Sequence, residues 1–224
     1  MLIPSIDLMG SNIVQLVQGE KKALEFDDFS PWVERFSRFP LVQVIDLDAA
    51  LGRGNNRALV ASLCRQLPCQ VGGGVRTVAA AQDFLEAGAR RVIIGSSLFA
   101  DGTINQQFAQ DIGRVIGSSR LVFAVDCRSG RVVTEGWKNA TAITPTAAIG
   151  VLEPWCQAFL YTHVDTEGLL QGFPLPLAHE LRRATARQLI VAGGISTREE
   201  IEMLDHIGVD AVVGMAIYSG KILA

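Results

Sequence analysis

The sequence lacks the long apolar runs and the excess of basic residues that mark membrane-spanning and nucleic-acid-binding proteins. No apolar run reaches the roughly 20 residues that span a bilayer, and the opening MLIPSIDLMG has no basic segment ahead of an apolar one. With 20 Lys and Arg against 23 Asp and Glu, the formal net charge is −3. Binding through phosphate neutralisation is therefore not favoured. We expect a cytoplasmic protein with neither a membrane nor a nucleic-acid partner.

Cysteine and histidine are also scarce, and neither is arranged as a metal site. The four cysteines are Cys64, Cys69, Cys127 and Cys156, which form no CxxC pair and no zinc spacing. Each lies in or beside an apolar run, which predicts buried free thiols and fits a reducing cytoplasm. The three histidines, His163, His179 and His206, are scattered along the chain. The sequence therefore predicts no metal site.

Short apolar runs rich in Val, Ile and Leu alternate with segments of helical spacing. The runs are residues 2–8, 41–47, 69–73, 90–95, 120–126, 158–165, 188–194 and 210–216, and the clearest helical segments are 77–89, 146–157, 174–186 and 196–208. No run alternates cleanly between apolar and polar residues, which is typical of parallel strands buried on both faces. This pattern predicts a single (β/α)8 TIM barrel domain over residues 1–224.

Several residues recur at nearly one spacing, in the same context at the end of an apolar run. Asp7 and Asp126 are 119 residues apart (126 − 7), as are Gly95 and Gly214 (214 − 95). The other pairs are Asp46 with Asp165 and Asp48 with Glu167, both at 119, and Gly73 with Gly193 at 120. The repeat predicts two fused half-barrels, about residues 1–119 and 120–224.

Glycines follow four of the expected strands. A glycine there lets the backbone approach a ligand, and the N–H groups that begin the next helix can bind an anion. Gly194 and Gly214 would form one phosphate site with neighbouring amides, and Gly74, Gly95 and the Ser96 and Ser97 hydroxyls would form its counterpart. Two such sites imply a substrate with a phosphate at each end. The alternative is that these glycines only permit tight turns.

Two carboxylates would face each other between these sites. Asp7 ends the first strand and Asp126 ends the fifth, which lies opposite in an eight-stranded barrel. Such a pair can divide general acid and general base roles on either side of one carbon skeleton. The alternative for either residue is a helix cap or a turn.

Six stretches together resemble the ProFAR isomerase (phosphoribosylformimino-5-aminoimidazole carboxamide ribotide isomerase) family of histidine biosynthesis. They are IPSIDLMGSNIVQLVQGE, VIDLDAALGRGNN, QVGGGVRT, IIGSS, AVDCRSGRVVTEGW and VAGGIS, and the resemblance covers essentially the whole chain. It implies a duplicated barrel that binds a bisphosphorylated aminosugar. It also implies an aldose–ketose isomerase, which performs an Amadori rearrangement without a cofactor.

The resemblance also implies site residues. Asp126 would be the acid and Asp7 the base, with Thr162 as a third catalytic residue. Residues expected to contact substrate or phosphate are Gly73, Gly74, Arg76, Gly95, Ser96, Trp137, Glu167, Gly193, Gly194, Gly214 and Met215.

Three residues depart from the family pattern. Gln15 and Gln43 stand where ProFAR isomerases usually have Arg and His, and Glu167 stands where they usually have Asp. Glutamine cannot reproduce the bidentate grip of arginine. These departures keep a related paralogue open, acting as lyase, cyclase or isomerase on another phosphorylated metabolite, for example in methanopterin-linked one-carbon metabolism. A non-catalytic binder of phosphorylated ligands is a further alternative. The sequence predicts no oligomeric state.

Overall fold

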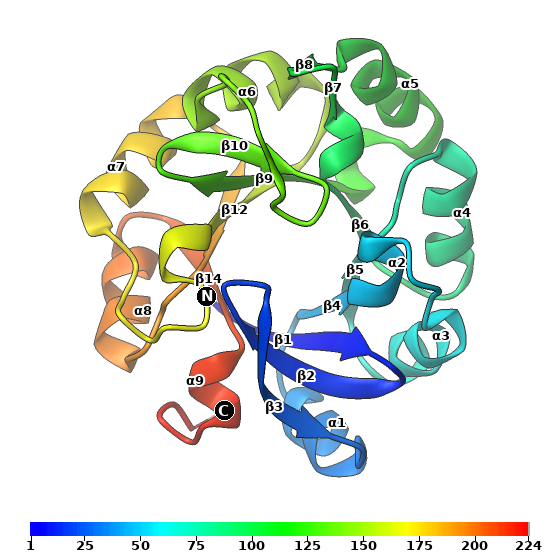
Figure 1. Cartoon of the computed structure of the whole chain (residues 1–224), viewed down its shortest axis with the longest axis vertical. Coiled ribbons are helices and arrows are strands. Elements are labelled where there is room, and N and C mark those ends of the chain that lie inside the picture. The colour runs from blue at the N-terminus through cyan, green and yellow to red at the C-terminus, as the bar shows by residue number, and fades with distance from the viewer. Residues whose placement is uncertain (224) are drawn as a thin grey trace.

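Eight parallel strands close into a barrel in the computed structural model, which describes residues 1–223 (Figure 1). The strands are β1 (Leu2–Met9), β4 (Val42–Asp46), β5 (Cys69–Gly72), β6 (Arg91–Ile94), β9 (Leu121–Arg128), β12 (Ala158–His163), β13 (Gln188–Ala192) and β14 (Val209–Val213). Each pairs with the next, β6 pairs with β9, and β14 pairs with β1 to close the ring. The predicted TIM barrel is confirmed.

Helices surround the barrel, and their starts follow from the sequence. They are α1 (Ser30–Phe36), α2 (Leu47–Leu51), α3 (Arg57–Gln66), α4 (Val78–Glu86), α5 (Gln106–Ile116), α6 (Pro145–Leu152), α7 (Leu175–Ala184), α8 (Arg198–His206) and the four-residue α9 (Met215–Tyr218). Thr197 and Glu200 form a capping box at the start of α8, and Thr77 caps α4. The four predicted helical segments are confirmed, with ends that differ by a few residues.

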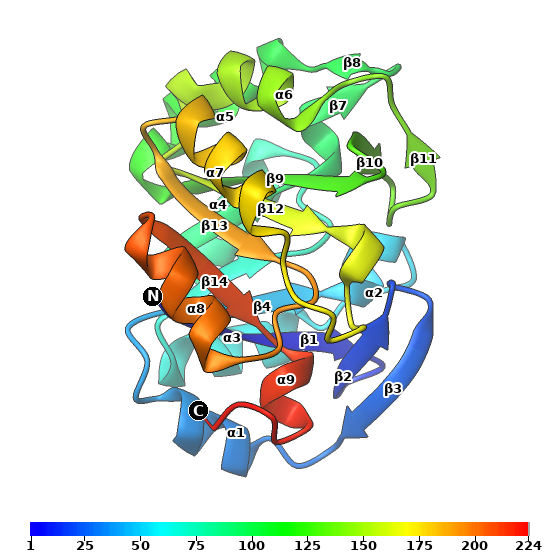
Figure 2. The same cartoon turned by 90° about the vertical axis from the view of Figure 1, so that its left-hand side faces the viewer.

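Two hairpins extend the barrel at one end. β2 (Asn12–Val17) and β3 (Lys21–Phe26) follow β1, while β10 (Arg131–Thr134) and β11 (Asn139–Ala140) follow β9. Figure 2 shows both hairpins at the end of the barrel opposite the N-terminus. A short pair, β7 (Phe99–Ala100) and β8 (Thr103–Ile104), lies outside the barrel sheet. The carboxyl ends of the barrel strands therefore open between two hairpins.

The core has two layers. One lies between sheet and helices, and the other fills the barrel with residues such as Ile3, Ile93, Val122, Ile190 and Val212. All four cysteines are buried and free, as predicted. No helix among residues 1–223 is long and apolar enough to cross a membrane.

The residue pairing predicted between the two halves is wrong for the second strand of each. Asp7 neighbours Ile45 in the sheet and Asp126 neighbours Thr162, so the matching positions are 117 residues apart (162 − 45). Asp48 therefore matches Asp165, not Glu167. Asp48 accepts a hydrogen bond from the Gly10 N–H at 2.7 Å, and Asp165 accepts one from the Ser129 N–H at 2.8 Å.

The cause is a difference in loop length. The segment between the first and second barrel strands is two residues shorter in the second half, and the spacing returns to 119 at Gly95 and Gly214. Asp46 consequently matches His163, since 163 − 46 is also 117. The origin of the barrel from two half-barrels stays a prediction.

Candidate active site

A cavity of about 260 Å³ opens at the carboxyl ends of the barrel strands. Every residue predicted for catalysis or binding lines it: Asp7, Gly73, Gly74, Arg76, Gly95, Ser96, Asp126, Trp137, Thr162, Glu167, Gly193, Gly194, Gly214 and Met215. This is the end at which TIM barrels carry their active sites. The predicted residues therefore all line the same cavity, while their individual roles stay predictions.

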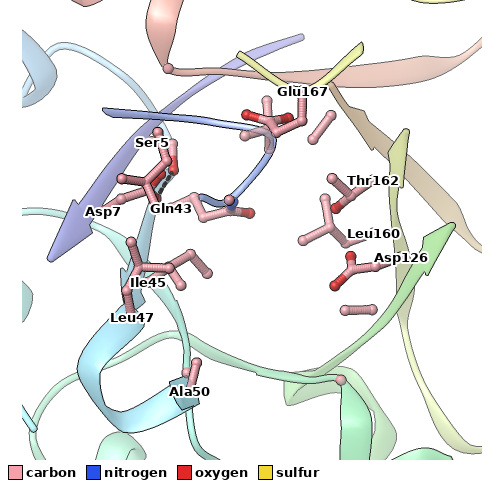
Figure 3. Close-up of a pocket in the computed structure, with 18 of the residues that line it drawn as sticks. Ser5, Asp7, Gln43, Ile45, Leu47, Ala50, Asp126, Leu160, Thr162 and Glu167 are labelled. Atoms are coloured by element: carbon pink, nitrogen blue, oxygen red, sulfur yellow. Dashed lines mark hydrogen bonds between the residues drawn. The ribbon is translucent and has the colours of Figure 1, made fainter. Parts of the chain in front are cut away.

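Asp7 and Asp126 stand on opposite walls of this cavity (Figure 3). Asp7 comes from β1, and its Oδ1 accepts a hydrogen bond from the Ser5 hydroxyl at 2.9 Å. Asp126 comes from β9, and its Oδ2 accepts one from the Trp137 indole N–H at 2.9 Å. Thr162, its neighbour on β12, adds a side-chain hydrogen bond to Asp126. A ligand between the walls would meet one carboxyl group on each side.

Burial changes the acidity of both aspartates. It raises the pKa of Asp7 to about 6, against the opposing effect of the Ser5 hydrogen bond. Burial also raises the pKa of Asp126, against the hydrogen bonds from Thr162 and Trp137. A raised pKa brings a carboxyl group closer to the pH range in which it can both give and take a proton, which suits general acid and base roles.

Glu167 is a third carboxyl group in the cavity. Burial raises its pKa to about 8, and the negative charges of Asp7 and Asp126 act in the same direction. Its main-chain carbonyl accepts a hydrogen bond from the Gln18 N–H at 3.0 Å, which ties it to the first hairpin. The raised pKa favours the protonated form of the Glu167 side chain, which can donate a hydrogen bond.

Two of the predicted glycines are required by the backbone itself. Gly73 has φ +106°, and a Cβ there would clash with the Asp46 carbonyl oxygen. Gly193 has φ +109°, and its Cβ would clash with the His163 carbonyl oxygen. Close packing thus explains these two glycines without a ligand, whereas a Cβ on Gly95 would make only an ordinary contact with Ala124 at 3.8 Å.

The hydroxyl groups predicted to bind phosphate already have partners. Ser97 donates to the Val75 carbonyl at 2.6 Å, and Ser96 accepts from the Glu135 N–H at 2.9 Å. Arg76 donates to the carbonyl oxygens of Ala49 and Ala50 at 3.3 and 3.1 Å. It is the only cationic side chain lining the cavity within residues 1–223. Ser96 only accepts in this contact, so its hydroxyl proton, main-chain N–H groups and Arg76 are the donors left for an anion.

The loop of the second hairpin folds over the cavity. Glu135, Gly136 and Trp137 all have positive φ, between +55° and +69°. The Trp137 ring lies against Gly19 of the first hairpin, where a Cβ would come within 2.8 Å of ring carbons. Each hairpin thus helps to place the other.

The sequence analysis did not identify Ser5 or the contacts that Gln15 makes. Ser5 lies two residues before Asp7 and therefore on the same face of β1, a spacing that could have identified it. Gln15 is only 3% exposed, and its Nε2 donates to the Val14 carbonyl at 2.8 Å. A Cβ atom added at Gly214 would lie 2.5 Å from the Gln15 Oε1, so Gln15 packs closely against this glycine. No local sequence pattern indicates that contact. His163 does not line the cavity; its Nδ1 lies 3.9 Å from Asp165.

Fold and cavity together are those of a (β/α)8 barrel with a candidate site at the carboxyl ends of its strands. The chain matches the family described as "Histidine biosynthesis protein" over residues 1–223 and belongs to it. Among the part of the chain that the structure describes, no three His, Cys, Asp or Glu side chains form a group that could hold a metal ion.

Relatives in this family share about a third of its residues. A protein of Methanocaldococcus jannaschii is 36% identical over 99% of this chain and 94% of its own length. One from a strain of Thermus thermophilus is 35% identical over 99% and 95%, and one from Deinococcus radiodurans is 34% identical over 99% and 94%. All three are named as isomerases of a phosphoribosyl imidazole-4-carboxamide, the activity called ProFAR isomerase above. The predicted family and the isomerase class are confirmed.

Proposed function

We propose that this isomerase of histidine biosynthesis acts on ProFAR, opening its aminoaldose and converting it to the aminoketose without a cofactor. The observation that carries the proposal is the pair Asp7 and Asp126 on facing walls of one cavity. Its glycine-lined ends, at β5–β6 and β13–β14, support binding of a substrate with a phosphate at each end. The names of the relatives agree with this substrate.

The two proton transfers of the reaction are divided between Asp126 on one wall and Asp7 on the other. Asp126, protonated, gives its proton to the ribose ring oxygen; the bond from C1 to that oxygen breaks, and the nitrogen lone pair forms the C=N bond of a Schiff base. Asp7, ionised, then removes the proton at C2, and the C–H electrons form an enolamine. Asp7 then returns its proton to C1, Asp126 takes the proton of the C2 hydroxyl, and the ketone forms with both carboxyl groups back in their starting states. Each step needs one group that holds a proton and one that lacks it, which the raised pKa values of both aspartates permit.

The remaining residues serve this exchange. Thr162 and Trp137 orient the Asp126 carboxyl group through their hydrogen bonds. Glu167, in its protonated form, would offer a hydrogen-bond donor to the substrate beside the two aspartates. Arg76 and the amides near Gly73, Gly74, Gly95 and Ser96 would bind one phosphate, and those near Gly193, Gly194, Gly214 and Met215 the other.

Turnover of ProFAR tests the proposal directly. The purified protein is supplied with ProFAR, and its product is followed by coupling to the downstream glutaminase–cyclase. We expect turnover at an ordinary enzymatic rate, lost in Asp7→Asn. Folded protein that binds ProFAR but does not convert it would overturn the proposal.

A second candidate is isomerisation of another phosphorylated aminosugar. The observation that favours it is the polar lining: Gln15 and Gln43 replace a cation and a histidine usual in the family, and Arg76 is the one cationic side chain in the described lining. Mass spectrometry separates the remaining alternatives, because an isomerase leaves the substrate mass unchanged while a lyase or cyclase does not.

A further inference from the structure

A row of polar side chains crosses the inside of the barrel below the cavity. Gln43, Gln70 and Arg91 lie side by side in register on β4, β5 and β6. Arg91 Nη2 donates to Gln70 Oε1 at 2.6 Å, and Gln70 Nε2 donates to Gln43 Oε1 at 3.0 Å. Gln70 is fully buried and Gln43 is 6% exposed. This row links the barrel floor to the cavity wall.

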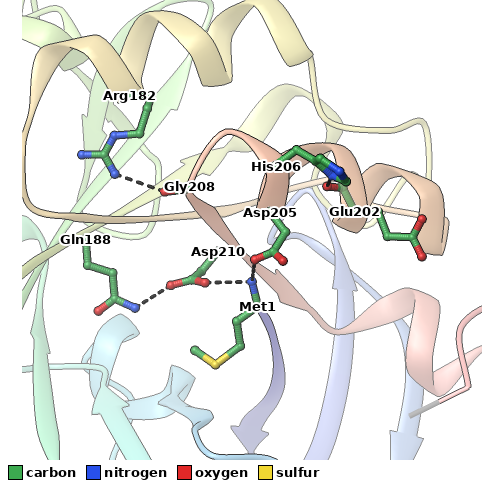
Figure 4. A network of polar contacts seen from close by, with 8 residues as sticks. All are labelled: Met1, Arg182, Gln188, Glu202, Asp205, His206, Gly208 and Asp210. Carbon is green, nitrogen blue, oxygen red and sulfur yellow. Dashed lines mark hydrogen bonds and ion pairs between the residues drawn. The ribbon is translucent and has the colours of Figure 1, made fainter.

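A second arm leads from the same arginine away from the cavity. Arg91 Nη1 donates to Gln188 Oε1 at 2.5 Å, and Gln188 Nε2 donates to Asp210 Oδ2 at 2.5 Å. Asp210 also pairs with the Met1 amine at 2.9 Å (Figure 4). Both arms therefore begin at a guanidinium group held among fixed partners.

The arginine sets the direction of every hydrogen bond in the first arm. A guanidinium group donates only, so Gln70 must present its oxygen to Arg91 and its NH₂ group to Gln43. Gln43 must then accept with its own oxygen. Its NH₂ group is left without a partner among the hydrogen bonds of residues 1–223 and belongs to a side chain that lines the cavity. Reversing either amide would place two donors, or two acceptors, against each other in a buried row.

The exposed end of Gln43 lies beside the catalytic wall. Gln43 is the register neighbour of Ser5, whose hydroxyl binds Asp7, and Figure 3 shows the three residues together. A ligand that reaches Asp7 therefore passes a fixed N–H donor. An oxygen acceptor in that part of the ligand would be favoured, and a positively charged or donor-only group would be disfavoured.

We propose that Gln43 is a specificity-determining residue that donates a hydrogen bond from Nε2 to a hydroxyl oxygen of the substrate beside Asp7. Gln70 and Arg91 are positioning residues that hold the Gln43 amide in this orientation. The inference rests on the proposed function and adds to it the residue that recognises the sugar portion of the substrate.

Two glutamate substitutions test it kinetically with ProFAR. Gln43→Glu keeps an acceptor for Gln70 but turns a carboxylate toward the cavity. Gln70→Glu keeps an acceptor for Arg91 but cannot donate, so the Gln43 amide reverses. Each should lower kcat/KM about 10- to 100-fold, mainly through KM, since one donor to substrate is lost. In a Gln43→Leu background, Gln70→Glu should have no further effect on kcat/KM, because it acts only through Gln43.

Gln188→Glu is the matched control. It adds the same carboxylate to the same arginine, on the arm that leads away from the cavity. We expect kcat/KM within about twofold of the unaltered protein, even where the added charge beside Asp210 lowers Tm. Equal losses of kcat/KM in Gln188→Glu and Gln70→Glu would overturn the positioning role and indicate general damage to the barrel.

A ligand-free measurement tests the orientation itself. In protein with ¹⁵N-labelled glutamine side chains, the Gln43 NH₂ protons should exchange rapidly with water while those of buried Gln70 are protected. In Gln70→Glu the Gln43 protons should become protected. Protected Gln43 protons in the unaltered protein would overturn the proposal. If ProFAR is not turned over, the proposed function fails, and this exchange experiment still decides the orientation.

Discussion

The two halves of the barrel share a frame and differ in the groups attached to it. Each half begins with a strand that carries an inward aspartate, Asp7 or Asp126, and continues into a hairpin. In each, a carboxylate on the following segment binds the hairpin turn, Asp48 at Gly10 and Asp165 at Ser129. The repeated groups hold the backbone, which indicates that the frame depends on them in both halves.

The chemistry around the two aspartates is not repeated. Asp7 accepts one side-chain hydrogen bond, from Ser5, whereas Asp126 has partners in both Trp137 and Thr162. At the spacing of 117, Glu167 matches Ala50, so only the second half adds a third carboxyl group. The proposed division of acid and base roles between the two aspartates needs such a difference in their surroundings.

The largest effect on activity should come from replacing Asp7 or Asp126, the two aspartates at matching positions of the halves. Asp7→Asn and Asp126→Asn should each lower kcat for ProFAR by about 10²–10⁴-fold, because each removes one proton-transfer group. Asp48→Asn and Asp165→Asn are the matched controls, since they alter the frame and should change kcat less than about 10-fold. If only one of the two catalytic variants loses activity, the division of roles between the halves is wrong.

The paired glycines should be equally intolerant of a side chain. Gly73→Ala and Gly193→Ala should each lower the free energy of unfolding by about 3 kcal/mol, since each Cβ meets a carbonyl oxygen and each φ is positive. Gly54→Ala is the control: Gly54 has φ +112° with nothing within 4 Å of its Cβ. Urea denaturation measures all three. A loss in Gly54→Ala as large as in the other two would mean that φ alone, and not packing, requires these glycines.

The hydrogen bonds that distinguish the aspartates should move opposite limbs of the pH profile. Ser5→Ala removes the bond that lowers the Asp7 pKa, so that pKa rises above about 6 and the acidic limb of kcat/KM moves to higher pH. Thr162→Val removes a hydrogen bond that lowers the Asp126 pKa, so that pKa rises. Because Asp126 must be protonated to act as the acid, the alkaline limb of kcat/KM moves to higher pH. Each shift should be about half to one pH unit. Movement of the same limb by both variants would contradict the assignment of acid and base.

The smallest effect, a change in Tm, should come from replacing Glu167, the carboxyl group that has no counterpart in the first half. The Glu167 pKa is raised from 4.5 to about 8 on folding, so the unfolded chain loses its proton first and stability falls as pH rises between these values. Glu167→Gln should therefore raise Tm at pH 8, by roughly 2–4 °C for about 1 kcal/mol. Ala50→Glu, which adds a carboxyl group at the position of the first half that matches Glu167, should lower Tm at pH 8. Thermal unfolding at pH 5 and pH 8 checks both, and a Glu167→Gln gain confined to pH 5 would contradict the sign.

Much of the frame could be predicted from the sequence. Buried runs of Val, Ile and Leu indicated the eight strands, and the residues at their carboxyl ends lie in one cavity because parallel strands end together. The pairing of Asp48 with Glu167 failed for a physical reason: loop length varies freely between strands, so one offset cannot serve a whole barrel.

The contacts that distinguish the halves could not be predicted in the same way. The hydrogen bond from Trp137 to Asp126 depends on three successive positive φ values and on the space above Gly19. The row from Arg91 to Gln43 joins residues that are 48 positions apart (91 − 43) and become neighbours only when the sheet forms. Such features follow from the closed barrel and not from any local pattern.

The position of Trp137 also makes its fluorescence a probe of the cavity. Of its three tryptophans, Trp32 packs on Tyr218 with ring centroids 4.2 Å apart, and Trp155 lies against Gly113. Only Trp137 binds a titratable carboxylate at the cavity. With Trp32 and Trp155 replaced by Phe, the emission of the remaining indole would follow both the charge of Asp126 and the position of the hairpin, without any added label.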